Sequence, residues 1–251
     1  MIHKAGFRLG ATLWLLAMMG FVVLAFTVLP QLVAQSPRKI PFAIVLLVSG
    51  MQSGVMLLLA VWAGVTLSRQ LGLGAPVLEA ALAGSGWWSA LRKQLLPAML
   101  VGLVVGAMLL AAERLAPSEL KAAGHTVDIP LAAKLLYGGV TEEVLLRWGL
   151  MTTLLWLPWR VLQKRAGLPR PAFAIGAIVV SAVLFGAGHL PAAVAMGATL
   201  TTPVIAFIII GNSLPGILFG GLYWRKGIEA AIMAHALGHL IGFLGHALLQ
   251  T

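Results

Sequence analysis

Two adjacent carboxylates, Glu142 and Glu143, stand inside an apolar stretch of the chain that runs from Leu131 to Trp156. The whole chain has only 7 acidic residues, so a pair of them at membrane depth needs a physical reason. A charged carboxylate at the centre of a bilayer costs about 3 kcal/mol on insertion scales. It persists where it faces a polar interior, pairs with another charge or takes part in a reaction. Glu142 and Glu143 are therefore candidate catalytic groups.

The position of Arg147 distinguishes the two carboxylates. Glu143 and Arg147 are i and i+4 with the acid first, which is the favourable order for a helical ion pair. Glu142 is rotated by about 100° on an α-helix and lacks that partner. Gly138 and Gly139, one turn earlier, leave space for a neighbouring helix or for a substrate backbone. We expect Glu142 to be the catalytic base. The alternative is a buried ion pair that only orders the bundle.

Three histidines in later apolar segments complete the set of candidate groups. His189 follows Phe185 by one turn, and we expect Phe185 to contact substrate. His235 and His239 are i and i+4 on one helical face, a spacing that suits metal ligands. The glutamate that follows the first histidine in zincin proteases is absent. The alternatives are a satisfied core histidine at His189 and a helix-packing stripe at the pair.

Together these groups can activate a water molecule in two ways. A carboxylate and an imidazole can bind and deprotonate the water, while other imidazoles donate hydrogen bonds to a developing oxyanion. Alternatively, a divalent metal such as zinc can activate it. The candidate metal ligands are Glu142, His189, His235 and His239. Either scheme describes a hydrolase that works within the membrane.

The elements that must position these residues are membrane-spanning helices. Of the 251 residues, 60% are hydrophobic and 10% are charged, whereas soluble domains have about 25% charged residues. The alternating segments of a transmembrane β-barrel are absent. We predict an all-α, polytopic transmembrane helical bundle that forms one membrane-embedded domain (1–251), with its catalytic core at about 131–250. The chain has no cysteine, which excludes a thiol nucleophile.

The hydropathy pattern predicts about seven spans, with a range of six to eight. They cover approximately 9–29, 40–67, 95–112, 131–156, 171–189, 202–224 and 227–249. We expect the first span to be retained rather than cleaved as a signal peptide, and Pro30 to close it. Residues Trp87 to Lys93 are predicted to form a separate interfacial helix. Asn212 and Pro215 interrupt the sixth span and can break it in two.

The basic residues are divided unequally between the two ends of these spans. With the N-terminus inside, the cytoplasmic segments carry Lys4, Arg8, Arg69, Arg92, Lys93, Arg160, Lys164, Arg165, Arg170, Arg225 and Lys226. The opposite side carries Arg38, Lys39, Arg114 and Lys121. This bias predicts a cytoplasmic N-terminus and a last span that ends outside. The net charge of +10 thus indicates contact with the lipid bilayer rather than with nucleic acid.

The order of these motifs resembles that of a known family. The pattern is E-E-x-x-x-R, then F-x-x-x-H, then H-x-x-x-N or similar, on successive spans. The matching residues are Glu142, Glu143, Arg147, Phe185, His189 and His235. They resemble the CAAX protease and bacteriocin-processing (CPBP, or Abi) family, which includes the CAAX prenyl endopeptidase. The resemblance covers about residues 131–250.

The resemblance implies an intramembrane endopeptidase that cuts a membrane-associated protein or peptide. In it, Glu142 and His189 would activate the attacking water, and His235 with the residue one turn later would stabilise the oxyanion. That later residue is usually Asn in the family and is His239 here. An imidazole can still donate a hydrogen bond, and it also adds a candidate metal ligand. Both a metal-free, glutamate-dependent mechanism and a metallopeptidase fit the pattern.

Two other functions fit the same composition. One is a non-catalytic membrane scaffold or immunity-type binding partner, and the other is a proton- or ion-coupled transporter, for which no inverted repeat is found. The small size favours a bacterial inner membrane. The sequence predicts no oligomeric state. The predicted spans also place His189 about 10 Å deeper than Glu142 and His235. A tilted helix, or one that begins in the basic connection outside the hydrocarbon, would remove this difference.

Overall fold

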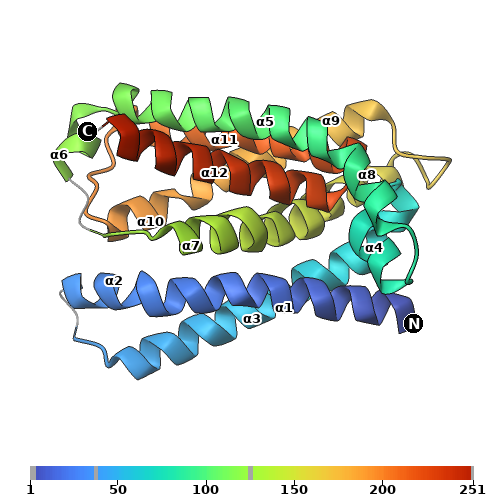
Figure 1. Ribbon diagram of the computed structural model, residues 1–251, viewed down its shortest axis with the longest axis horizontal. Helices are drawn as coiled ribbons and strands as arrows, with labels where there is room; N and C mark the ends of the chain where they lie inside the picture. Colours follow the sequence, from blue (N-terminus) through green and yellow to red (C-terminus); the bar gives the residue numbers. More distant parts are fainter. Residues whose placement is uncertain (1–3, 37–38, 124–126, 250–251) are drawn as a thin grey trace.

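The structure is a computed structural model that describes residues 4–36, 39–123 and 127–249. Within these ranges the chain forms helices and no strand, which confirms the all-α prediction. Figure 1 shows the long helices lying side by side in one bundle, with the two ends of the chain at opposite ends of it.

The helices follow one another along the chain with short connections. The first half contains α1 (Lys4–Thr27), α2 (Leu29–Gln35), α3 (Phe42–Leu67), the 3₁₀ helix η1 (Ser68–Leu71), α4 (Pro76–Leu82), α5 (Trp87–Leu115) and α6 (Ser118–Ala123). The second half contains α7 (Leu131–Ala133), η2 (Lys134–Glu142), η3 (Val144–Met151), α8 (Thr152–Val161), α9 (Pro171–Gly188), α10 (Leu190–Ala195), α11 (Thr202–Lys226) and α12 (Ile228–Leu249).

Among the described residues, 6 helical segments are long and apolar enough to span a membrane, within the predicted range of six to eight. They are 4–35, 42–71, 87–115, 171–195, 202–226 and 228–248. The segment 131–161 is a further long helical stretch in the same bundle (Figure 1). It carries the two central carboxylates and Arg147, which lower its hydropathy. The chain therefore passes through the bundle as the predicted order of spans requires.

Three predicted boundaries are wrong. The helical path continues beyond Pro30, because this proline lies in the first turn of α2, where a missing N–H is tolerated. The segment 87–93 is not a separate interfacial helix but the first turns of α5, which continues through Pro97. Helix α11 is unbroken at Pro215. In a membrane bundle, neighbouring helices can satisfy the backbone groups that a proline leaves free.

The segment that carries the two carboxylates is held by close packing against the N-terminal helices. The Thr141 hydroxyl donates to the Ala17 carbonyl of α1 at 2.6 Å. Trp148 is fully buried, and its ring lies directly against Gly64 of α3, where any side chain would collide with it. Gly149 likewise lies so close to Ala60 of α3 that a side chain at position 149 would collide with it. Small residues thus allow the backbones to approach closely, as is usual in membrane bundles.

The same segment has an unusual backbone. Both η2 and η3 are π-helices, of 9 and 8 residues, so that each N–H is paired with the fifth preceding carbonyl. π-Helices are rare and usually last one turn, and they occur often at functional sites. The α-helical geometry expected from the sequence for residues 134–142 and 144–151 is therefore wrong. The irregular backbone therefore coincides with the predicted catalytic residues.

Candidate catalytic site

A fully buried ion pair forms the base of the site. Arg147 Nη1 lies 2.9 Å from Glu143 Oε1, and their side chains are 1% and 0% exposed. Arg147 Nη2 also donates to the Gly216 carbonyl at 3.1 Å. The guanidinium carbon lies 4.9 Å and 5.4 Å from the ring centres of Phe185 and Phe219. The predicted pairing of Glu143 with Arg147 is therefore present, and two aromatic rings enclose the cation.

Glu143 has a second partner that the sequence did not predict. His235 Nδ1 lies 2.8 Å from Glu143 Oε1, and because an ionised carboxylate only accepts, the imidazole N–H donates this bond. The His235 ring is also stacked on Phe219, with centroids 4.4 Å apart. Glu143 and Phe219 together fix the orientation and the tautomer of His235, which leaves its Nε2 as the ring nitrogen that can accept a hydrogen bond.

Glu142 faces that nitrogen. Its Oε2 lies 3.9 Å from His235 Nε2, which is too long for a direct hydrogen bond. A water molecule can bridge two polar atoms at this distance. The Glu142 side chain is 17% exposed, whereas Glu143 is completely buried. The two adjacent carboxylates thus have different environments, in agreement with the distinction expected from Arg147.

The other two histidines lie next to His235. The rings of His235 and His239 are stacked, with centroids 4.9 Å apart. His189 Nδ1 donates to the Phe185 carbonyl at 2.8 Å, which leaves its Nε2 as an acceptor. Phe185 lies edge-on to both His189 and His235, at 4.7 Å and 6.2 Å between ring centres. The structure therefore gathers the residues of all three sequence motifs around Phe185.

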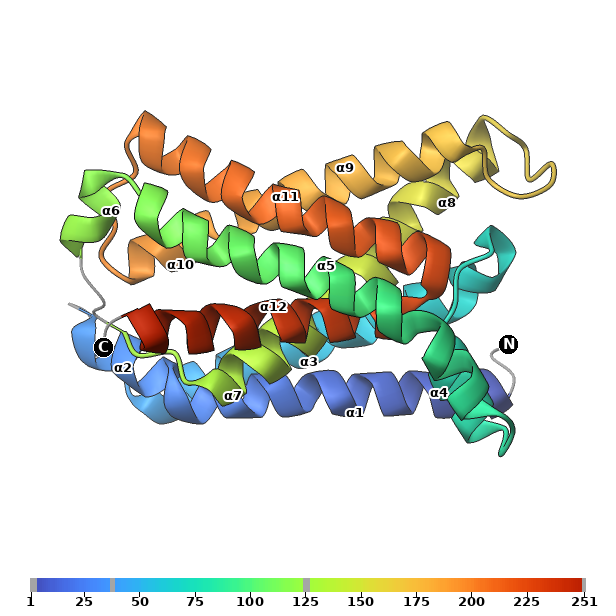
Figure 2. The ribbon, with the colours of Figure 1, turned by 45° about the horizontal axis from the view of Figure 1, so that its top comes forward.

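The predicted difference in depth between His189 and His235 is absent. Figure 2 shows the connection between α8 and α9 extending beyond the neighbouring helix ends, so that α9 begins further out than α12. His189, at the far end of α9, is consequently level with His235, near the start of α12. A helix that begins outside the rest of the bundle is one of the two explanations considered from the sequence.

The substrate-binding roles expected for Gly138, Gly139 and Phe185 stay predictions, and in the structure all three residues contact neighbouring helices. The space beside Gly138 is filled by the ring of His239, and Gly139 lies against Ala236 of α12. Phe185 is 6% exposed and is enclosed by His189, His235 and Arg147. Of the two uses expected for the space beside the glycines, a neighbouring helix or a substrate backbone, the packing favours the neighbouring helix. Phe185 packs against the candidate catalytic side chains.

The candidate metal ligands do not fit a preformed metal site. Among the described residues, no group of three or more His, Asp or Glu side chains is arranged to hold an ion. His235 Nδ1 is already bonded to Glu143. The rings of His235 and His239 are stacked, so the lone pairs of their nitrogens lie in two separate planes and do not point at one common position. Zinc requires nitrogens that converge at about 2.0–2.1 Å. The described arrangement of these side chains does not meet that requirement.

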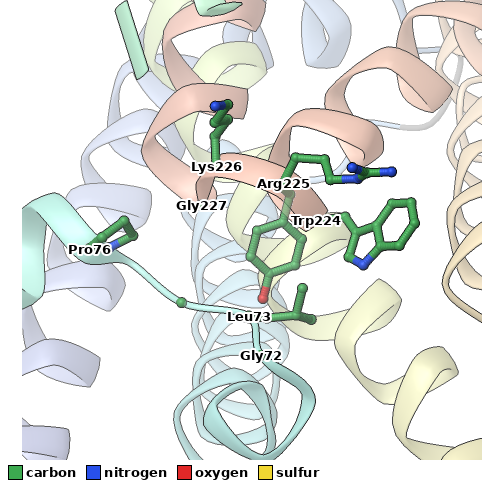
Figure 3. A pocket seen from close by; sticks show the side chains of 9 residues that line it. Gly72, Leu73, Pro76, Trp224, Arg225, Lys226 and Gly227 are labelled. Atoms are coloured by element: carbon green, nitrogen blue, oxygen red, sulfur yellow. The ribbon is translucent and has the colours of Figure 1, made fainter. Parts of the chain in front are cut away.

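A surface hollow of the described structure lies away from these residues. It has a volume of about 240 Å³ and is lined by the turn between α11 and α12 and by the connection between η1 and α4. Figure 3 shows Trp224, Arg225 and Lys226 on one side of it, and Leu73 and Pro76 on the other. A smaller apolar hollow of about 170 Å³ lies between α8 and α9. Neither hollow contains a residue of the candidate catalytic site.

Comparison with known proteins supports the resemblance seen in the sequence. Residues 128–241 match the family model described as type II CAAX prenyl endopeptidase Rce1-like. This match confirms the resemblance to the CAAX protease family, and it includes all the candidate catalytic residues. No curated protein and no solved structure matches the chain.

Proposed function

We propose, from the prenyl endopeptidase match of residues 128–241, that this chain is an intramembrane endopeptidase. It would hydrolyse a peptide bond of a membrane-associated protein or peptide. The match gives the reaction class. The observation that carries the proposal is the 3.9 Å separation between Glu142 Oε2 and His235 Nε2, with the other nitrogen of that imidazole held by Glu143 at 2.8 Å.

Glu142 and His235 are the groups proposed to activate the water. A water between them donates one hydrogen bond to Glu142 Oε2 and the other to His235 Nε2, and it directs a lone pair at the substrate carbonyl. Glu142 accepts a proton as the water oxygen bonds to the carbonyl carbon. It then returns this proton to the leaving nitrogen as the C–N bond breaks. The products are a carboxylic acid and an amine.

The remaining histidines can be assigned from their hydrogen bonds. His189 donates its Nδ1 hydrogen to the Phe185 carbonyl, so its neutral form offers only an acceptor to the reaction. No protein hydrogen bond in the described structure fixes the tautomer of His239, which is free to donate to the oxyanion. We assign His239 to the oxyanion and His189 to the water side. The family resemblance instead places His235 at the oxyanion, a role that requires an imidazolium.

Replacement of Glu142 tests the proposal. Glu142→Gln keeps the shape but removes the base, and we expect it to lower the cleavage rate of a membrane-peptide reporter by about 10²–10⁴-fold. Glu113→Gln is the matched control, because Glu113 is an exposed carboxylate paired with His246 outside the site. Unchanged thermal unfolding of both variants would exclude misfolding. Undiminished cleavage by Glu142→Gln would contradict the assignment of Glu142 as the base. Absence of cleavage in the wild type as well would favour a non-catalytic binding role.

The proposed setting is the cytoplasmic half of a bacterial inner membrane. The chain is an integral membrane protein with 6 candidate spans among its described residues. The orientation rests on the distribution of lysine and arginine. The partners that follow from this setting are a membrane-associated substrate and the surrounding lipid.

A further inference from the structure

The last residues of α8 and its connection to α9, residues 160–170, combine exposed positive charges with exposed apolar side chains. We call this segment the basic loop. Its basic residues, all exposed, are Arg160, Lys164, Arg165 and Arg170. Val161, Leu162 and Leu168 are 59%, 70% and 69% exposed. The sequence has no acidic residue between Glu143 and Glu229, and none of the ion pairs in the described ranges involves the loop.

Side chains of the chain itself fix the shape of the basic loop. The Gln163 amide donates to the carbonyls of Ala166 and Leu168 at 2.6 Å and 2.7 Å, and its oxygen accepts from the Arg170 N–H at 3.0 Å. Trp159 Nε1 donates to the Gly167 carbonyl at 2.8 Å. These bonds hold the loop in one conformation without a partner molecule.

Two of the basic residues are held in a strained backbone conformation. Lys164 and Arg165 have φ values of 51° and 63°, in the left-handed region. This conformation costs roughly 1–2 kcal/mol for each residue other than glycine. Such strain persists only where the surroundings determine it, and it is frequent at functional sites. Here the hydrogen bonds of Gln163 fix this conformation.

The place of the basic loop in the fold relates it to the catalytic site. Figures 1 and 2 show it projecting at the end of the bundle where the N-terminus and α4 lie. This end carries most of the basic residues and is the predicted cytoplasmic end. The loop directly joins the segment that contains Glu142 to the helix that ends at His189. The position of the loop therefore affects the depth of Glu142 and of His189 in the membrane.

We propose that the basic loop binds the phosphate headgroups of anionic phospholipids in the cytoplasmic leaflet. Leu162 and Leu168 would enter the level of the upper acyl chains. Leucines beside clustered lysine and arginine are typical of surfaces that lie in the membrane interface. The loop belongs to a bundle surrounded by bilayer, so headgroups are always beside it. Its preformed shape lowers the entropy cost of binding.

A consequence for activity follows, and it rests on the proposed peptidase function. Anionic lipid bound at the loop would fix the relative depth of Glu142 and His189. Cleavage in discs that contain phosphatidylglycerol should then exceed cleavage in discs of phosphatidylcholine alone. The binding experiment below does not use cleavage, so failure of the lipid proposal and failure of the peptidase proposal are distinguishable.

The absence of native cysteine allows the lipid contact to be measured at one position. Leu162→Cys carries an environment-sensitive fluorophore in nanodiscs of phosphatidylcholine with or without phosphatidylglycerol. We expect a blue shift of emission as phosphatidylglycerol is added, and its reversal at high salt. Ser85→Cys, an exposed position in the connection between α4 and α5 at the same end, is the matched control and should not shift. Equal emission in both lipids would overturn the proposal.

Two variants of the labelled protein separate charge from preformed shape. Lys164→Gln/Arg165→Gln removes two charges, and we expect it to raise the phosphatidylglycerol fraction needed for half of the shift by roughly tenfold. Gln163→Ala keeps every charge but loses three hydrogen bonds, and it should weaken the response by a smaller factor. Inorganic phosphate or soluble polyglutamate added to phosphatidylcholine discs should leave the emission unchanged. A shift caused by either one would assign the loop to free phosphate or to an acidic polypeptide instead.

Discussion

At the scale of single residues, Glu143 has two separable functions. It neutralises Arg147 and orients His235. Glu143→Leu would leave a buried guanidinium without its counter-ion, and we expect it to lower the free energy of unfolding by about 3–5 kcal/mol. It should also lower cleavage, because Leu cannot accept the hydrogen bond that orients His235. Denaturation in mild detergent and a cleavage assay measure the two losses.

A double variant distinguishes these two functions of Glu143. Arg147 Nε and Glu143 Oε2 have no hydrogen-bond partner among the described residues, so the pair is incompletely satisfied. Replacing both members with apolar residues, as in Glu143→Leu/Arg147→Met, should recover much of the stability. It should not recover cleavage, because His235 remains unoriented. Recovery of both properties would show that Glu143 is only structural.

His239 decides between the metal-free and the metal-dependent scheme. His239→Asn keeps a hydrogen-bond donor, and we expect it to retain most of the cleavage activity. His239→Leu should lose about 10²–10³-fold, the usual cost of removing one oxyanion donor. Elemental analysis of the purified wild type and of His239→Asn completes the test. Stoichiometric metal in the wild type that is lost with activity in His239→Asn would contradict the metal-free mechanism.

At the scale of elements, hydropathy predicted the spans, and the i, i+4 spacing predicted the pairing of Glu143 with Arg147. Neither predicted the second bond of Glu143, because the contact of α12 with this residue, between η2 and η3, depends on tertiary packing rather than on spacing along one helix. Phe219 was missed for the same reason, since an aromatic residue in an apolar span has no distinguishing pattern. The π-helices were missed because no local composition separates them from α-helices.

The contact of α3 with the catalytic segment can be tested at one glycine. A Cβ added at Gly64 would lie within the Trp148 ring, so Gly64→Ala should lower stability by about 1–3 kcal/mol. It should also lower cleavage by displacing the helix that carries Glu142. Gly176→Ala in α9 is the control, because nothing lies within 4 Å of its added Cβ. Equal stability of the two variants would mean that α3 does not constrain the segment.

At the scale of the whole molecule, the distribution of charge predicts the orientation in the membrane. Single cysteines at Ser85 and Thr199 place one thiol in an exposed connection at each end of the bundle. With the N-terminus cytoplasmic, an impermeant thiol reagent should label Thr199→Cys in right-side-out vesicles. Ser85→Cys should be labelled only after permeabilisation. The opposite result would reverse the topology and would place the basic loop outside.

The extension of α9 beyond the neighbouring helices also has a consequence for the bilayer itself. A membrane adjusts to uneven apolar edges by local thickening or thinning, at fractions of a kcal/mol per ångström. The exposed leucines beside the start of α9 would draw the cytoplasmic leaflet outwards on one flank of the bundle only. Such an asymmetric rim would give the protein a preference among membranes of different thickness. It would also favour one side of the bundle for the approach of another chain embedded in the membrane.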